Sequence, residues 1–269
     1  MSQRFQYQLR GLAYWAECAN PFRATVTARH LPLGLKVQGY KRDCVGRGLY
    51  RRHVHEPGLT KFLLETYAST SGSNFLDVGA NIGYFSCLFG RLAGPTGSVV
   101  AIEPEPQNRQ LLESNLRNNH LRNVTIHDCA VGAQDGFARM GIYKAANRGR
   151  HSLVDLDPCE NFIDVPVRRL DDLLKDSHHA VWDLLKIDVE GFEPFVFAGA
   201  TETLSRTESL ALEFSPALWK KSYTKPADVF HNLSSNFSRI YRFHNLDLIP
   251  ITAAECANSD FTLDLLLRR

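Results

Sequence analysis

The stretch Asp77-Val78-Gly79-Ala80-Asn81-Ile82-Gly83 decides the fold of this chain. It begins within a short apolar run, 75–78, and leads into a segment of helical character, 84–93, which Gly94-Pro95 terminates. The two glycines permit a tight turn and let the backbone approach a ligand closely. The first turn of the following helix offers unpaired N–H groups. The stretch therefore predicts a strand, a ligand-binding turn and a helix.

Strand-like and helix-like segments alternate along the rest of the chain. We expect core strands over 75–78, 98–102, 124–129, 181–189, 210–214, 240–243 and 261–267, and exposed or edge strands over 137–144 and 162–167. We expect helices over 59–67, 84–93, 106–118, 194–204 and 227–235. Helices between apolar strands imply a mostly parallel α/β sheet, whose ligands bind at the carboxyl ends of the strands.

The length and charge of the chain fit one α/β domain that follows an N-terminal extension. The 269 residues carry a net charge of +2, which gives no indication of general polyanion binding. We place the extension at 1–55, as a lid, substrate or interface element, and the main domain at 56–269. A local basic group is either a solvated surface or a patch that contacts an acidic substrate; it comprises Arg42, Arg47, Arg51 and Arg52.

The cysteine pattern and hydropathy indicate the cellular setting. Six scattered cysteines form no C-x-x-C pair, so neither a zinc site nor a disulfide framework is predicted. No window reaches the roughly 18 apolar residues of a spanning helix, and the start lacks the apolar stretch of a signal peptide. We expect a soluble, cytoplasmic protein with reduced thiols and no transmembrane segment. A loose membrane association and a homodimer stay open.

An acidic residue lies at the carboxyl end of each of the first two predicted strands. Asp77 precedes the turn, and Glu103 ends the next strand, where a carboxylate can accept both ribose hydroxyls of an adenosine-type cofactor. A dinucleotide site would need G-x-G-x-x-G, but Ala80-Asn81 replaces the middle glycine here. Asp77 is badly placed beside a pyrophosphate and well placed to hold an ammonium group. The pattern favours S-adenosylmethionine, which carries an adenosine and an amino acid but no phosphate.

The run 74–86, Asn-Phe-Leu-Asp-Val-Gly-Ala-Asn-Ile-Gly-Tyr-Phe-Ser, resembles the opening motif of the FkbM family of methyltransferases. Leu185-Lys186-Ile187-Asp188-Val189-Glu190-Gly191 looks like the fourth-strand motif of that family. Ala130-Val131-Gly132, the run 165–173 and His55-Glu56-Pro57 are also similar to family motifs. Together these motifs cover about 55–215, and several ordered motifs are more specific than a glycine loop alone.

The resemblance implies a Rossmann-like class I methyltransferase fold, a seven-stranded, mostly parallel sheet whose last strand is antiparallel. It also implies S-adenosylmethionine as the cofactor and methyl donor, and O-methylation of a hydroxyl. The acceptor would be a small molecule or glycan: a sugar, a glycan or a glycosylated or polyketide-like metabolite. A nucleic-acid acceptor ranks low, because the only basic cluster in the sequence is the arginine group described above.

Cofactor-binding residues follow from the same resemblance. The methionine end of the cofactor would be lined by Asp77, Gly79, Asn81 and Gly83, and Glu103 would hold the ribose. Asp128 and Cys129 would lie beside the adenine; an asparagine-like residue followed by alanine is more usual there. Glu56 either closes over the cofactor or is a helix cap or surface acid.

The fourth strand carries the candidate catalytic residues. Lys186, Asp188 and Glu190 alternate, which places all three on one face if the strand extends that far. They form either a structural ion pair or a functional row. Asp188 is the preferred general base for the acceptor hydroxyl, with Lys186 as its partner. His151 is a further candidate base, or a solvated loop residue.

A divalent cation such as magnesium is compatible with the acidic strand ends. Its ligands would be Asp188, Glu190 and Glu213, because carboxylate oxygens suit magnesium or calcium. Two or three carboxylates near a cationic donor can also stand without a metal, so the metal stays open.

Two other functions compete with methyl transfer. A nicotinamide-dependent oxidoreductase is disfavoured by the missing middle glycine and by Asp77. A non-catalytic cofactor-binding protein of the same fold is disfavoured by the intact set of acidic residues at 77, 103, 188 and 190.

Overall fold

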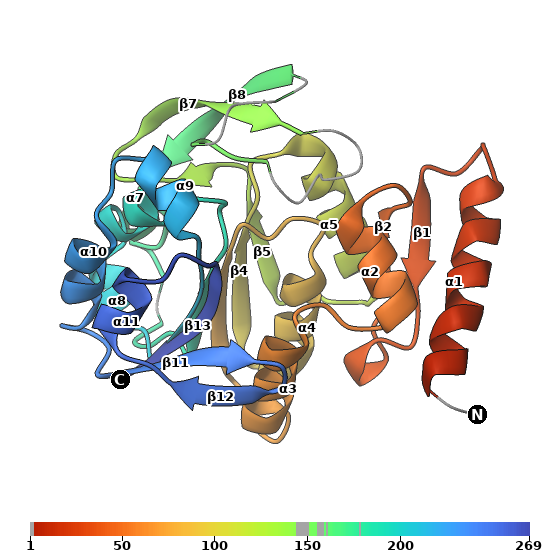
Figure 1. Cartoon of the computed structure of the whole chain (residues 1–269), viewed down its shortest axis with the longest axis horizontal. Coiled ribbons are helices and arrows are strands. Elements are labelled where there is room, and N and C mark those ends of the chain that lie inside the picture. Colours follow the sequence, from red (N-terminus) through yellow and green to blue (C-terminus); the bar gives the residue numbers. More distant parts are fainter. Residues whose placement is uncertain (1–2, 144–150, 155–158, 160, 178) are drawn as a thin grey trace.

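The computed structural model describes residues 3–143, 151–154, 159, 161–177 and 179–269. Its centre is an eight-stranded sheet of order β12-β11-β13-β10-β9-β3-β4-β5 (Figure 1). The strands are β3 (Asn74–Val78), β4 (Ser98–Ile102), β5 (Val124–His127), β9 (Leu184–Ile187), β10 (Ser209–Phe214), β11 (Arg239–His244), β12 (Asp247–Pro250) and β13 (Leu263–Arg268). Strands β5, β4, β3, β9 and β10 are parallel, whereas β13 pairs antiparallel with β10.

The expected parallel sheet with an antiparallel last strand is confirmed, but the predicted count of seven strands is wrong by one. The eighth strand, β12, forms a hairpin with β11. Asn245 in the connecting turn has a φ of 56°, a left-handed conformation that asparagine tolerates in turns. The short segment 247–250 had no periodicity of its own from which to predict a strand.

Helices cover both faces of the sheet. One face packs against α3 (Pro57–Tyr67), α4 (Tyr84–Ala93) and α5 (Pro106–Asn118). The other packs against α6 (Leu170–Leu173), α7 (Glu193–Ala198), α8 (Thr201–Ser205), α9 (Pro216–Lys221), α10 (Pro226–Leu233) and α11 (Ala253–Ala257). The alternation of each strand serves both layers: Phe75 belongs to the first core, and Leu76 to the second.

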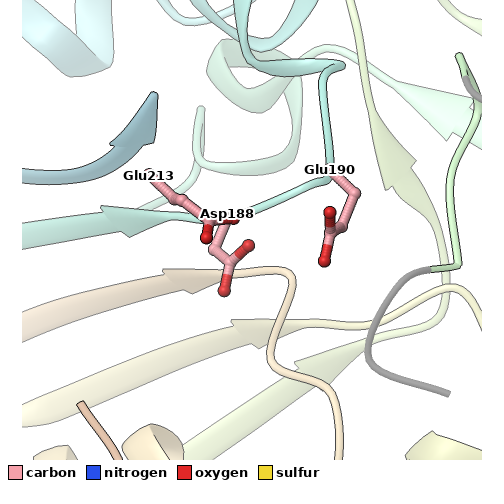
Figure 2. A group of neighbouring side chains, drawn as sticks. All are labelled: Asp188, Glu190 and Glu213. Atoms are coloured by element: carbon pink, nitrogen blue, oxygen red, sulfur yellow. The ribbon is translucent and has the colours of Figure 1, made fainter. Parts of the chain in front are cut away.

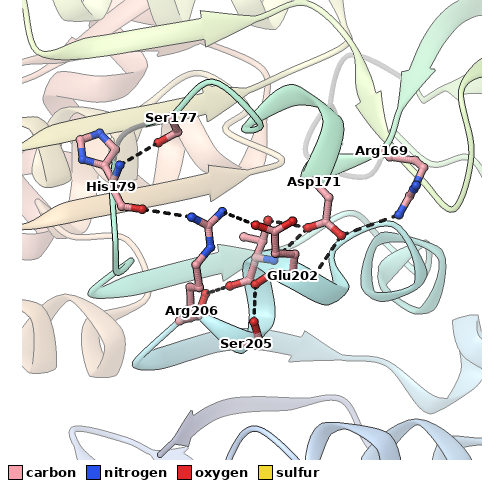
Figure 3. A network of polar contacts seen from close by, with 9 residues as sticks. Arg169, Asp171, Ser177, His179, Glu202, Ser205 and Arg206 are labelled. Atoms are coloured by element: carbon pink, nitrogen blue, oxygen red, sulfur yellow. Dashed lines mark hydrogen bonds and ion pairs between the residues drawn. The ribbon is translucent and has the colours of Figure 1, made fainter.

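The single helix expected over 194–204 is two short helices, α7 and α8. The break lies at Gly199, where an added Cβ would come within 2.0 Å of the Gly132 carbonyl oxygen. Asp171 then caps α8, because its carboxylate accepts from the Thr203 amide and hydroxyl, both at 2.8 Å. Figure 3 shows this network, which continues through the Glu202–Arg206 ion pair at 3.3 Å.

A second, three-stranded sheet extends the carboxyl-end side of the central sheet. It has the order β6-β8-β7 and consists of β6 (Ala130–Val131), β7 (Gly136–Ile142) and β8 (Asn161–Arg168). The two segments expected to be exposed strands are β7 and β8, which pair antiparallel.

The N-terminal segment is folded against the main domain. It comprises α1 (Gln3–Ala19), β1 (Thr25–Ala28), the 3-10 helix η1 (Pro32–Gly34), β2 (Val37–Tyr40) and α2 (Cys44–Arg52). The buried amide of Asn115 on α5 pairs with the Gln38 backbone, donating to its carbonyl at 2.9 Å and accepting from its N–H at 2.7 Å. Val37 and Leu49 join the α3–α5 core. Among the described residues, no helix is long and apolar enough to cross a membrane.

Candidate active site at the carboxyl ends of the strands

The turn after β3 is held by the neighbouring strand. The amides of Gly79 and Ala80 both donate to the Ile102 carbonyl at 3.0 Å. A Cβ on Gly79 would lie 2.0 Å from the Asp188 carbonyl oxygen, so only glycine lets this turn pass so close to the end of β9. Gly83 is needed for a different contact, because a Cβ there would meet Leu112 at 2.4 Å. The predicted glycine turn is present, and packing is one reason for both glycines.

A first cavity opens beside this turn. Glu103, which is buried, accepts from the amides of Asn81 at 2.7 Å and Glu105 at 2.9 Å. Burial raises the pKa of Glu103 to about 7. The cavity is lined by Val78, Gly79, Asn81, Ile102, Glu103, Pro104, Asn108, Cys129, Ala130, Val131, Met140, His151, Leu153, Asp188, Val189, Glu190 and Phe192. The wall of this cavity therefore combines apolar side chains with the carboxylates of Glu103, Asp188 and Glu190.

Asp77 lies beneath the turn. Its side chain is fully buried, and one carboxylate oxygen accepts from the Ser86 hydroxyl at 2.5 Å. The other oxygen, Oδ1, has no hydrogen-bond partner among the residues that the structure describes. Burial raises the pKa of this carboxyl. A buried carboxylate oxygen with spare capacity is a site where a cation or donor would be stabilised.

Four further predicted site residues, three expected around the cofactor and one a candidate base, lie in different surroundings. Cys129 is buried and lines the first cavity, whereas Asp128 is exposed and is not among the lining residues. His151 lines the first cavity, where its Nδ1 accepts from the Tyr143 amide at 3.1 Å. Glu56 lies outside this cavity.

A second cavity adjoins the first on the α3 side of the sheet. It is lined by Cys44, Val45, His55, Glu56, Leu59, Asn81, Lys186, Ile187, Asp188, Glu190, Ala211, Leu212, Glu213, Phe243, Asp264 and Leu265. Asn81, Asp188 and Glu190 line both cavities. These three residues mark the boundary at which groups bound in the two cavities would meet.

Strand register explains why acids gather in the second cavity. Lys186 pairs in register with Asp77 of β3, and Glu213 of β10 pairs with Asp264 of β13. Alternation places these side chains on the sheet face that α3 and α4 cover, opposite the residues of the second core. The charged row therefore draws on four strands. The sequence indicated Asp77, the 186–190 row and Glu213 on three of them, and it missed Asp264 on β13.

Lys186 is the positive centre of this row. Its Nζ lies 3.0 Å from Asp188 Oδ2 and 5.1 Å from the centre of the Phe85 ring, and its side chain is buried. Burial alone would lower the pKa of Lys186, but Asp188, Glu56 and Asp77 outweigh it and raise that pKa. Burial would likewise raise the pKa of Asp188, but Lys186 outweighs it and lowers that pKa. The pair is held fully ionised.

Asp188, Glu190 and Glu213 each place a carboxylate oxygen within 4.8 Å of the others (Figure 2). The expectation that Glu190 continues the strand alternation is wrong, because β9 ends at Ile187. Glu190 instead reaches the cavities from a turn in which its φ is 51°. Repulsion by Asp188, followed by burial, raises the pKa of Glu213 to about 10, so Glu213 is protonated near neutral pH.

Glu193 fixes the turn that carries Asp188 and Glu190. Its buried carboxylate accepts from the amides of Val189 and Gly191, both at 3.1 Å, and from Trp219 Nε1 at 2.8 Å. Sequence reasoning missed Glu193, although it follows the fourth-strand motif by two residues. Its role depends on Trp219, which lies 26 positions further along the chain.

His55 and Asp264 are two more residues of the second cavity that the sequence did not single out as site residues. His55 Nε2 lies 3.6 Å from Glu56, and burial lowers the pKa of His55 to about 4, which leaves the imidazole neutral at pH 7. Burial raises the pKa of Glu56 to about 8. Glu56, expected beside the cofactor, thus faces the second cavity from a left-handed backbone position with a φ of 40°.

Comparison with known proteins agrees with this geometry. The model of the methyltransferase FkbM domain matches residues 77–242. This chain belongs to the FkbM methyltransferase family. The 31-O-demethyl-FK506 methyltransferase FkbM of Streptomyces tacrolimicus is 30% identical over 159 residues, which are 49% of this chain and 60% of that protein. Methyltransferase sdnD of Sordaria araneosa is 29% identical over 156 residues, again covering 60% of the relative and 47% of this chain.

A solved structure supports the fold. The methyltransferase FkbM from Methylobacillus flagellatus KT superimposes with a TM-score of 0.50 over 81% of this chain and 49% of that chain, at 22% identity. The central sheet of this FkbM-family member, with its antiparallel β13, is that of a class I methyltransferase. The match to the curated relatives spans about 60% of their length.

Proposed function

We propose that the protein transfers a methyl group from S-adenosylmethionine to a hydroxyl of a small, polar acceptor such as a sugar ring or a glycosylated metabolite. The observation that carries this proposal is the meeting of two chemically different cavities at Asn81, Asp188 and Glu190. Methyl transfer needs donor carbon and acceptor oxygen in line and in contact, so a shared boundary between two sites is the required geometry.

The lining of the first cavity suits the donor. Glu103 offers acceptor oxygens for ribose hydroxyls, and Ile102, Val131 and Met140 offer apolar surface for an adenine ring. The unpaired buried oxygen of Asp77 lies beneath the same turn and would attract the positively charged methionine end. We assign Gly79 and Asn81 to that end, and Cys129 to the adenine end. When bound, the donor supplies a methyl group that its sulfonium has already activated.

The second cavity fits a small acceptor. Its volume of about 260 Å³ is close to the lower end of the range for small-molecule sites, about 300–1,000 Å³. Carboxylates and a neutral His55 can accept hydrogen bonds from several hydroxyls of one ring. The segment 1–55 contributes Cys44, Val45 and His55 to this wall, which supports a substrate-binding role for the extension.

Asp188 is our candidate base. It stands at the boundary of the cavities, and Lys186 holds it ionised, so its carboxylate can accept the hydroxyl proton as the acceptor oxygen takes the methyl group. Lys186 is assigned to positioning and charge compensation. His151 lies in the first cavity but is absent from the lining of the second, so we favour Asp188 over it.

Calorimetric titration with S-adenosylhomocysteine, with NAD as the control ligand, tests the donor assignment. We expect binding of S-adenosylhomocysteine alone. Glu103→Ala should lose that binding, whereas Asp164→Asn, an exposed acid on β8, should keep it. Binding of NAD alone would favour an oxidoreductase, and wild-type affinity in Glu103→Ala would remove Glu103 from the site.

Methyl transfer to a panel of glycosides then tests the base. Asp188→Asn should keep S-adenosylhomocysteine affinity and lose turnover by about 10²–10⁴-fold, the usual contribution of a positioned base. Retained turnover would exclude Asp188. The same assay with added magnesium or with EDTA addresses the carboxylate cluster: turnover that requires magnesium would assign Asp188, Glu190 and Glu213 to a cation.

A further inference from the structure

Charge is distributed very unevenly along the chain. Residues 1–55 contain ten lysines and arginines against two acids, a net charge of +8 with histidines neutral. Residues 56–269 contain 21 lysines and arginines against 27 acids, a net charge of −6. The overall charge of +2 therefore conceals a strongly basic N-terminal segment on an acidic domain. Neither of the two cavities described above requires this separation.

Helix α1 lies at one end of the molecule (Figure 1). Gly11 and Tyr14 face the protein, and the Tyr14 hydroxyl donates to the Lys41 carbonyl. The outward side is apolar: Leu9, Leu12 and Trp15 are 43%, 68% and 66% exposed. Over 9–19 the exposed positions are Leu9, Leu12, Ala13, Trp15, Ala16 and Ala19, and none of them is charged. This outer α1 face is the reverse of the usual polar surface of an amphipathic helix.

Basic residues border the outer α1 face. The two charged residues of α1 within 8–19, Arg10 and Glu17, lie on the side that turns toward β1 and α2. There they line a depression together with Arg23, Arg29, His30 and His53. Glu17 pairs with Arg23 at 3.6 Å, so the arginines remain in excess. Beyond the helix, Phe22 is a further apolar residue that is 94% exposed.

We propose that the outer α1 face, Phe22 and the bordering arginines form a docking surface for a membrane that contains anionic lipids. α1 would lie in the plane of the interface, with Leu9, Leu12 and Trp15 among the acyl chains and the arginines at the headgroups. An apolar helix face combined with cationic borders is the pattern of interfacial helices, and each lysine or arginine near an anionic surface adds attraction.

Other binding partners account for either the positive charge or the apolar face of this surface, but not for both. A symmetric dimer through α1 would bring two segments of net charge +8 together, which opposes association. A nucleic acid would account for the arginines but would leave Leu9 and Leu12 against phosphates. An anionic bilayer is complementary to both the charge and the apolar face.

Cosedimentation of the full chain with phosphatidylcholine vesicles, with and without phosphatidylglycerol, tests the proposal. Wild-type protein should bind the anionic vesicles, bind neutral vesicles weakly, and dissociate as salt rises. Leu12→Glu and Trp15→Glu should each lower the partition coefficient by about tenfold or more. Arg29→Glu should lower binding only to the anionic vesicles. Phe137→Glu, which changes an 82% exposed residue on β7, is the matched control and should bind like wild type.

Each remaining outcome overturns the proposal. The proposal is refuted if wild-type protein does not bind anionic vesicles, or if both α1 variants bind those vesicles as strongly as wild type does. A dimer in sedimentation analysis that Leu12→Glu converts to a monomer, without vesicle binding, would identify the outer α1 face as a self-interface. S-adenosylhomocysteine affinity, measured on every variant, separates loss of docking from loss of fold, because no described side chain of α1 lines either cavity.

Discussion

Replacing Lys186 by methionine tests the electrostatic design of the site most directly. Methionine keeps an unbranched apolar side chain and removes the ammonium group, together with its contact to the Phe85 ring. The change leaves Asp188 without the partner that lies at 3.0 Å, in a cavity that already holds Glu56 and Glu213. Removing one member of a buried ion pair costs about 3–5 kcal/mol. Because the Asp188 side chain keeps 28% exposure, we expect the lower end, about 3 kcal/mol.

A double-mutant cycle separates this charge effect from lost packing. Lys186→Met with Asp188→Asn removes both charges, so we expect a total cost of about 1 kcal/mol, well below the cost of either single change. Urea unfolding at neutral pH measures all four proteins. The proposed role of the pair would be refuted if the free energy of unfolding of a single variant lay within about 0.5 kcal/mol of the wild-type value. It would also be refuted if the double variant were as unstable as Lys186→Met.

The pH dependence of the cycle follows from the directions of the pKa shifts. The pKa of Asp188 is lowered by Lys186, so its contribution is present above the unfolded value of about 3.9 and is lost as pH falls through the folded value. The pKa of Lys186 is raised, so its contribution is present below about 10.4 and is lost as pH rises through the folded value. The deficit of Lys186→Met should therefore be greatest between about pH 5 and 9.

Two further predictions concern the buried carboxylates. Glu56, Glu103 and Glu213 have raised pKa values of about 8, 7 and 10, so the folded protein binds more protons than the unfolded chain above about pH 4.5. The melting temperature should therefore fall from about pH 6 to pH 9. A melting temperature that rises over this range would contradict these pKa shifts. Glu193→Gln places an amide N–H against Trp219 Nε1 and should cost about 2 kcal/mol in urea unfolding. Glu202→Gln, at an exposed acid on α8, is its control, and equal stability of the two variants would show that the Glu193 contacts are unimportant.

Local patterns were sufficient for the parallel half of the sheet and the turn after β3. Alternation and apolar runs predict β3, β4 and β10 within a residue or two, because these strands are buried on both faces. The length of β9 was overestimated. Apolar residues recur throughout 181–189 and predict a longer strand, whereas the chain turns after Ile187, where the Glu193 carboxylate accepts from the Val189 amide. Contacts distant in sequence decide such boundaries, and a single segment does not reveal them.

Contacts distant in sequence also limit how many residues of the second cavity can be predicted from local patterns. Asp188 was identifiable from its motif, but Asp264 belongs to the site only through the register of β13 on β10. His55 lines the site from the position two residues before α3 begins at Pro57. Asp264 has no local pattern that distinguishes it from a surface acid, and the motif around His55 assigned no role to that histidine. Residues 1–55, which lacked readable periodicity, nevertheless supply part of the cavity wall.

Helix α2 connects the two proposed surfaces. Cys44 and Val45 at its start line the acceptor cavity, whereas Tyr50 and His53 near its end line the basic depression beside α1. A nine-residue helix is about 13 Å long. If α1 docks on a bilayer, the acceptor cavity therefore lies about one α2 length from the basic depression beside α1. The acceptor panel should accordingly include glycolipid headgroups presented on vesicles beside soluble glycosides. Faster methylation of the vesicle-bound acceptor in wild type, but not in Leu12→Glu, would link the two surfaces in one function.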